Sequence, residues 1–301
     1  MLKNNFADKA HLFNLHFIVF IFGFTGVLGE LIDLDAFSLV LNRMILASLT
    51  LFIFFKFQGI NLKLDPISLF KVLGVGLLTA AHWVTFFHAI KISNVSVTLS
   101  CIASTAFMVS LIEPIIFKRK VRLYEMGLGL LVMAGLYLIF RFEGDYTNGI
   151  IVALISAFLA ACFSTLNGKL LETVDAGPMA FWEMLGGVIS ISIYMVIQSD
   201  VPSAIWETSL DDSFYLLLLG TVCTAYPMVH IIKIMKKISP YSVALAVNLE
   251  PVYGIVLAFM IFGEEEKMKP AFYIGTVLIL AALFLDAVIK RVRRKRTTTV
   301  I

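Results

Sequence analysis

FTGVLGEL, residues 24–31, returns later in the chain as FSTLNGKL, residues 163–170. The pattern that follows it, Asp-Ala and later a charged residue before Met, occupies residues 35–44 and again residues 175–184, with the same internal spacing. Each match is weak alone, because apolar segments coincide easily. Matches in the same order at similar offsets indicate a tandem duplication, so we expect the two halves to share one backbone plan.

The composition is that of a membrane protein. Hydrophobic residues make up 59% of the chain and charged residues 15%, and the mean hydropathy is +0.92. In a soluble domain about a quarter of the residues are charged. The net charge of +3 is small and does not point to nucleic acid. We therefore expect the lipid bilayer to surround the chain, and no nucleic-acid partner.

Ten segments are long and apolar enough to be membrane helices, which need about 20 residues each. They lie near residues 12–30, 36–55, 68–90, 95–117, 122–140, 148–168, 178–198, 212–235, 240–262 and 270–289. Because five is odd, a second copy of a five-helix unit enters the membrane from the opposite side. The predicted fold is all-α integral membrane, with ten transmembrane helices as two inverted five-helix repeats, residues 1–144 and 145–290, and a basic cytoplasmic tail, residues 291–301.

The distribution of Lys and Arg predicts the orientation. Most of the 24 basic residues fall in loops on one side of this arrangement, including the cluster at residues 118–122 and the tail. Cytoplasmic loops carry the excess of Lys and Arg. We therefore expect a multi-pass protein of the inner (plasma) membrane with both termini in the cytoplasm.

Ionisable residues inside a span are costly if they face lipid, so they normally face a cavity or a partner. Glu250 lies near the middle of the ninth segment, and Pro251 frees a backbone carbonyl about one turn earlier. A carboxyl at a helix break near the midplane is typical of substrate and ion sites in transporters. We predict that Glu250 binds substrate and couples transport to protons; the alternative is a structural carboxyl at a kink.

His82, in the third segment, is a second candidate for proton coupling and substrate binding, because histidine titrates near neutral pH. The alternative is a histidine that only packs within the helix bundle. The other candidate substrate-binding residues are polar or aromatic groups within the spans: Trp83, Thr105, Tyr226 and Asn248.

Four charged residues are candidates for gating or charge balance. Arg43 and Glu183 occupy equivalent positions in the two copies, and inversion places Arg43 in the outer third and Glu183 in the inner third. We do not expect these two to pair directly, and we predict that Arg43 instead meets Glu30 at the outer mouth. Glu113, beside a proline in the fourth segment, is predicted to act as a gate or as a link to the basic cluster.

The stretch NLEPVYG, residues 248–254, followed by Phe-Gly-Glu at 262–264, resembles the ninth helix of drug/metabolite transporters of the EamA type. Residues 76–91 look like the third helix of that family, and the whole chain is similar in length and plan. Ala106 and Arg119 depart from the family pattern, which usually has proline and glutamate there. The resemblance implies a central cavity lined mainly by the first, third, fourth, sixth, eighth and ninth helices.

The sequence favours a secondary active transporter of small polar metabolites such as amino acids, an exporter or exchanger working by alternating access. An uncoupled facilitator or channel is the alternative. An enzyme is not predicted, since the spans lack HExxH and Gly-x-Ser-x-Gly patterns, and no GxxxxGK[ST] loop is present. The three cysteines lie far apart, so we expect no metal and no cofactor. The expected partner is a small-molecule substrate, and the protein is expected to be a monomer or homodimer.

Overall fold

The computed structural model describes residues 2–120, 123–142, 144–198, 208–235, 243, 246–247 and 249–298, and within these ranges the chain is helical without strands. The helices of the first half are α1 (Leu2–Leu31), α2 (Ala36–Phe57), α3 (Pro66–Ile92), α4 (Val95–Ile102), α5 (Thr105–Ile116) and α6 (Leu123–Phe142). The second half contains η1 (Gly144–Tyr146), α7 (Thr147–Leu170), α8 (Ala176–Ile197), α9 (Leu210–Gly220), η3 (Thr221–Ala225), α10 (Tyr226–Met235), α12 (Glu250–Phe262), η4 (Gly263–Glu266) and α13 (Pro270–Thr298).

Six segments of the described chain are long and apolar enough to cross a bilayer: Ala36–Phe57, Pro66–Ile92, Val95–Ile116, Gly144–Leu170, Ala176–Ile197 and Leu210–Met235. Three shorter apolar segments accompany them: Leu15–Leu31, Gly127–Phe142 and Pro270–Asp286. These lengths bear out a helical membrane protein. The count of ten spans stays a prediction.

Short polar loops cap the helices and keep the connections tight. Asp35 precedes α2, and its carboxylate accepts hydrogen bonds from the amides of Phe37 and Ser38. Asp65 does the same for α3, where Ser68 and Ile67 donate to it. A hydrogen bond from the Ser68 side chain, together with these amide hydrogen bonds, lowers the pKa of the exposed Asp65 carboxyl, because they stabilise its charged form. Such capping side chains accept hydrogen bonds from backbone amides that are otherwise unpaired at the start of a helix.

Two of the spans are interrupted near their middles. The segment Val95–Ile116, the predicted fourth span, is divided at residues 103–104 into α4 and α5. The segment Leu210–Met235, the predicted eighth span, contains η3, a π-helical turn in which the amide of Tyr226 donates to the carbonyl of Thr221, five residues earlier. Pro227 follows directly, and a proline ring clashes with the carbonyl four residues before it in a regular helix. The wider turn is the local accommodation of that proline.

The structure begins α12 at Glu250, so Pro251 occupies the first turn, where a missing amide costs little. The sequence predicted a kink about one turn earlier. Residues 248 and 244–245, in that turn, lie outside the described part of the chain.

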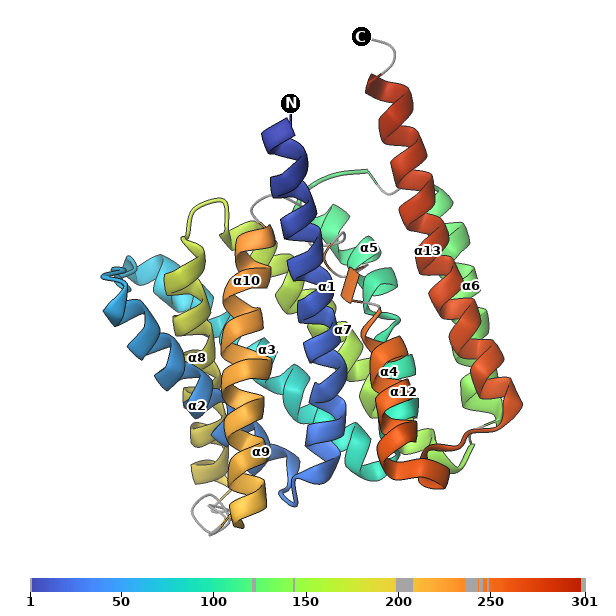
Figure 1. The fold of residues 1–301 in the computed structure, drawn as a ribbon, viewed down its shortest axis with the longest axis horizontal. Coiled ribbons are helices and arrows are strands. Elements are labelled where there is room, and N and C mark those ends of the chain that lie inside the picture. Colours follow the sequence, from blue (N-terminus) through green and yellow to red (C-terminus); the bar gives the residue numbers. More distant parts are fainter. Residues whose placement is uncertain are drawn as a thin grey trace.

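The helices form a bundle in which segments of the first half pack against segments of the second (Figure 1). The α6 and α13 helices lie side by side along one edge, α2 and α8 pack together toward the other, and α1 packs on α12 between them. The beginning of α1 and the end of α13 project from the same end of the bundle. The buried apolar side chains of the described residues fall into one large cluster around α2, α3 and α8, a smaller one around α4–α7 and α13, and a third formed by Ile18, Ile231 and Val243.

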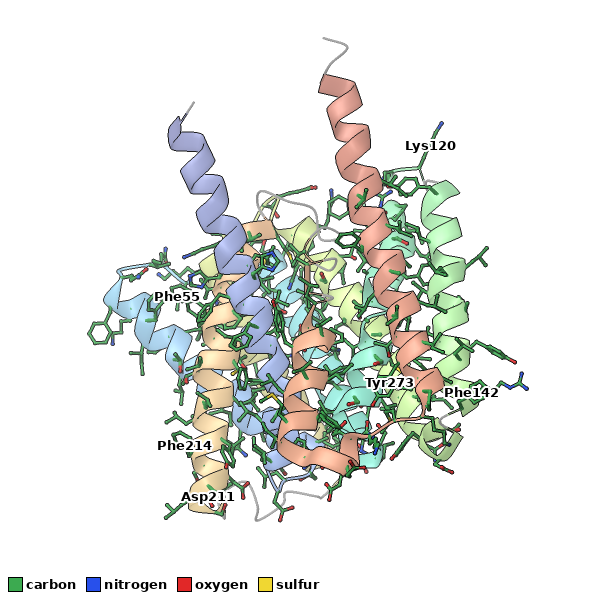
Figure 2. The ribbon with its side chains drawn as sticks, turned by 45° about the vertical axis from the view of Figure 1, so that its right-hand side comes forward. Phe55, Lys120, Phe142, Asp211, Phe214 and Tyr273 are labelled. Atoms are coloured by element: carbon green, nitrogen blue, oxygen red, sulfur yellow. The ribbon has the colours of Figure 1, made fainter. Side chains whose placement is uncertain are left out.

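The α6–α13 pair is antiparallel. Phe142, at the end of α6, and Tyr273, near the start of α13, lie at the same edge in Figure 2, and Lys269 donates a hydrogen bond to the carbonyl of Phe142. The contact between the helices is reciprocal. A Cβ on Gly135 would lie 2.6 Å from the carbonyl oxygen of Gly275, and a Cβ on Gly275 would lie 2.7 Å from that of Gly135. Glycine at both positions therefore lets the two backbones touch.

Candidate functional site

A cavity of about 150 Å³ lies among the helices of both halves. Its wall includes residues of α1, α3, α4, α5, α7, α10 and α12, which agrees with the helices that the family resemblance implied, and α2 adds Arg43. The wall is mostly apolar, and the polar side chains among its described residues are Thr25, Arg43, Thr79, His82, Thr105, Ser164 and Glu250. A largely apolar pocket with a few convergent polar groups is the usual form of a small-molecule site.

Glu250 lines this cavity from the first residue of α12, and only 8% of the residue is exposed. Arg43, on the opposite half of the chain, attracts it electrostatically. The two groups form no direct ion pair, although both residues are described. The cavity thus holds a carboxyl and a guanidinium that face a common space without contact.

Arg43 is almost fully buried, with 2% exposed, and belongs to the cavity. Its Nε donates a 2.6 Å hydrogen bond to Oγ1 of Thr224 in η3, and its guanidinium carbon lies 3.9 Å from the centre of the Trp83 ring. The predicted pairing with Glu30 is wrong. The aromatic face and the hydroxyl hold the guanidinium inside the bundle, whereas the backbone carbonyl of Glu30, at the end of α1, accepts a hydrogen bond from Lys91.

His82 lines the cavity but is also tied to α7. Its Nδ1 lies 2.9 Å from the carbonyl oxygen of Ser156 and 2.8 Å from the Ser156 hydroxyl, which donates to the carbonyl of His82. One ring nitrogen is therefore occupied by Ser156. This contact fits the alternative of a packing histidine, and a role in substrate binding or proton coupling has to use Nε2.

Trp83 and Thr105 both reach the cavity wall. Trp83 supplies the ring on which Arg43 lies. Thr105 is the first residue of α5, just after the break in the fourth span, and its hydroxyl is buried with no hydrogen-bond partner among the residues that the structure describes. Thr105 and Glu250 thus occupy the same local position, the first residue of a helix that faces the cavity.

The structure does not bring Tyr226 to the cavity. The lining residues of α10 are Met228, Ile231 and Met235, which share one helix face, and Tyr226 lies two residues before the first of them. At about 100° per residue, two residues turn a side chain to the opposite face. Tyr226 is 37% exposed and packs against His230, with ring centres 4.2 Å apart. Asn248, the remaining candidate, lies outside the described residues.

Glu183 and Glu113 occupy separate polar sites. Glu183 is fully buried in α8 and accepts hydrogen bonds from the Thr79 hydroxyl at 2.6 Å and the Asn167 amide at 2.9 Å. These contacts join α3, α7 and α8 just behind the cavity wall. Glu113 lies 3.6 Å from Arg119 in an ion pair at the end of the fourth span, which is the kind of link to the basic cluster that the sequence suggested.

Sequence reasoning missed the polar residues that complete this region: Thr25, Thr79, Ser156, Asn167 and Thr224. All are polar residues inside apolar spans, and their departure from the apolar pattern is the sequence signal that could have identified them. No group of His, Cys, Asp and Glu suited to a metal ion occurs in the described ranges.

At one end of the bundle, loops from the two halves are joined by hydrogen bonds. The carboxylate of Glu266 accepts the amides of Val95 and Ser96 at the start of α4, both at 2.9 Å. Nearby, the amide of Asp33 donates to the Asp212 carboxylate at 2.9 Å. Figure 2 places Asp211 at this end and Lys120 at the opposite end. Hydrogen bonds therefore connect the first and second halves of the chain at this end of the bundle.

The comparisons with known proteins agree with this architecture. A crystal structure whose chain is 14% identical superposes with a TM-score of 0.68, over 94% of this chain and 98% of its own, which supports the fold alone. The uncharacterized transporter YxxF of Bacillus subtilis (strain 168) is 24% identical over 280 residues, or 89% of this chain and 86% of that protein.

The sequence profile of the EamA-like transporter family matches residues 12–141 and again residues 147–286. The resemblance drawn from residues 248–254 is thereby confirmed. The two matches follow one another in the order of the repeated sequence patterns and together take in most of the helical bundle. Since they cover well over half of its length, the chain belongs to the EamA-like transporter family.

Proposed function

We propose that this protein is a secondary active transporter that moves small polar metabolites such as amino acids by alternating access, as an exporter or exchanger. The observation that carries the proposal is the shared cavity: helices of both halves line it, and a buried carboxyl and a buried guanidinium face into it. Charged groups inside a membrane bundle mark substrate and ion pathways, because the free-energy cost of burying a charge has to be offset by an interaction with a partner, a substrate or an ion.

The proposal includes ten spans in two inverted repeats. It is supported by the last helices of the two halves, α6 and α13, which pack side by side and antiparallel, as a two-fold axis in the membrane plane would place equivalent helices. A matching pair of contacts between the halves supports it as well. The first helix of the first half, α1, packs on α12 of the second half, and the corresponding helix of the second half, α7, packs on α5 and α4 of the first. Such symmetry allows a site between the halves to open to each side in turn.

We assign coupling to Glu250. A carboxyl at this position can carry a proton when the cavity faces one side and release it when the cavity faces the other. His82 is the second candidate, with Nδ1 held by Ser156. We place the protein in the inner (plasma) membrane with both termini in the cytoplasm, in keeping with Lys120 at the end from which α1 and α13 project.

Counterflow in proteoliposomes tests the proposal. The purified protein is screened against labelled amino acids and related metabolites, with and without an imposed proton gradient. We expect exchange of at least one solute and uphill accumulation driven by the gradient. Exchange without accumulation would support an uncoupled facilitator, and no exchange of any solute would refute transport of this class.

Glu250→Gln tests the coupling step. The amide keeps the size of the side chain and can still accept a hydrogen bond, but it cannot take up or release a proton, so we expect gradient-driven accumulation to be lost while part of the exchange remains. Glu265→Gln, in the exposed part of η4, is the matched control and keeps both activities. Accumulation at the wild-type level in Glu250→Gln would refute the assignment of Glu250.

A further inference from the structure

Arg43 is held in one orientation. Its Nε is bonded to Thr224, and its planar guanidinium lies over Trp83 and within 5.5 Å of the centre of the Phe87 ring. An arginine over a tryptophan face is stabilised by cation–π attraction. These contacts leave the guanidinium little freedom, and they engage one edge and one face of it.

The other edge of the guanidinium is not satisfied. Its Nη1 is buried and has no hydrogen-bond partner in the part of the chain that the structure describes. A buried donor without a partner costs about 1–3 kcal/mol, and more for a charged group. Arginine also presents its donors as a flat fork that matches a carboxylate. Arg43 therefore has the form of a carboxylate-binding group.

Two buried hydroxyls on other helices also lack hydrogen-bond partners among the described residues. Oγ1 of Thr25, in α1, and Oγ1 of Thr105, in α5, are buried without partners among the described residues, and both residues line the cavity with Arg43. Buried polar groups are normally hydrogen-bonded. Three unsatisfied groups from three helices around one cavity point to a polar ligand common to all of them.

We propose that Arg43 binds the carboxylate of the transported molecule, and that this molecule is an amino acid with an apolar side chain. The inference rests on the transport function proposed above and deepens it. Glu250, across the cavity, has the opposite charge and suits the ammonium group. The apolar wall, which includes Phe22, Phe86 and Phe163, suits the side chain.

The charged groups of the described wall favour a zwitterionic amino acid over an anion such as phosphate. Apart from His82, Arg43 is the sole basic residue among the described side chains of the cavity, and Glu250 faces it. A phosphate carries close to two negative charges and would meet one guanidinium and one carboxyl. A zwitterion carries one charge of each sign and matches both groups.

Matched pairs of probes test the carboxylate site in the purified full-length protein. Binding of L-leucine and L-phenylalanine is compared by calorimetry with binding of L-leucinamide and L-phenylalaninamide, which keep the amine and side chain but lack the carboxylate. We expect at least one acid to bind tenfold or more tightly than its amide, which corresponds to about 1.4 kcal/mol.

Variants of Arg43 connect that preference to this residue. Arg43→Gln brings the acid and the amide to similar affinity, and Arg43→Lys keeps part of the preference because the charge remains without the fork. Arg141→Gln, which removes an exposed arginine bonded to Tyr137, keeps the wild-type preference. If Arg43→Gln does not fold, the wild-type protein and Arg43→Lys still give the comparison.

Equal binding of acids and amides by the wild-type protein, or an acid preference that survives in Arg43→Gln, would overturn the inference. Counterflow separates the two proposals. Exchange with no preference for the carboxylate refutes the role of Arg43 alone. A carboxylate preference in binding that is lost in Arg43→Gln, in a protein that exchanges nothing, supports the site and refutes the transport function.

Discussion

The reciprocal glycine contact between α6 and α13 predicts that one added methyl group will destabilise the fold. In Gly135→Ala the new Cβ would lie 2.6 Å from the carbonyl oxygen of Gly275 and 2.7 Å from Cγ1 of Ile279. The first neighbour is backbone and cannot rotate away. The two helices must therefore separate, and the separation reaches the buried side chains of Ile139 and Ile279 on both sides of the contact.

The magnitude follows from two opposing effects. Overpacking of this kind costs about 1–3 kcal/mol. Alanine is favoured over glycine in a helix interior by about 1 kcal/mol, which offsets part of that cost. Gly127→Ala, in the same helix, receives only the favourable effect, because a Cβ there meets nothing within 4 Å. We expect Gly135→Ala to be less stable than Gly127→Ala by about 1–3 kcal/mol.

Thermal unfolding followed with a thiol-reactive dye measures this difference. Cys101 and Cys223 are free and buried, so the dye reacts as the bundle opens. Gly275→Ala should match Gly135→Ala, and the double variant should lose less than the sum of the two, because both act on one contact. If Gly135→Ala unfolds at or above the midpoint of Gly127→Ala, the contact between α6 and α13 is not as the structure has it.

Two further predictions use the same assay. Ser156→Ala removes the hydroxyl that joins α7 to His82 and lowers stability by about 1–3 kcal/mol, because the partner groups stay buried; Ser190→Ala, which loses only a bond within its own helix, changes it less. Glu266→Ala deprives two amides at the start of α4 of their acceptor and costs about 0.5–2 kcal/mol, whereas Glu265→Ala, with an exposed side chain, has little effect.

Each of these two predictions is refuted if the variant and its control lose the same stability. Equal losses in Ser156→Ala and Ser190→Ala would mean that the link between α3 and α7 adds nothing to stability. Equal effects of Glu266→Ala and Glu265→Ala would mean that the start of α4 is capped by another group.

The helices and the family could be predicted from sequence, because apolar length and the motif around Glu250 are local properties of the chain. Burial of Glu250 at the cavity also followed from its place within an apolar span. The position of Tyr226 could not be predicted. Its aromatic hydroxyl group within a span suggested substrate binding. The direction in which the Tyr226 side chain points, however, depends on the rotation of α10 after a wide turn that sequence periodicity does not reveal.

The contacts of Arg43 were beyond sequence reasoning for a different reason. A charge inside a span requires a partner, and the sequence offered Glu30 as the nearest opposite charge at the predicted outer mouth. The structure instead holds Arg43 against an aromatic face and a hydroxyl, those of Trp83 and Thr224, which come from α3 and η3. Neither is marked as a partner by its charge, so only the packing of three helices identifies them.

The π-helical turn at Thr221–Ala225 also sets the rotational phase of everything that follows it in the span. One residue more or less in a turn rotates the downstream helix by about 100° and shifts it by about 1.5 Å. A return of this turn to regular α-helical geometry, with no residue deleted, would swing Met228, Ile231 and Met235 off the cavity wall together. Because Arg43 donates to Thr224 within the turn, the group that we assign to the substrate carboxylate also contacts the segment on which this rotation depends.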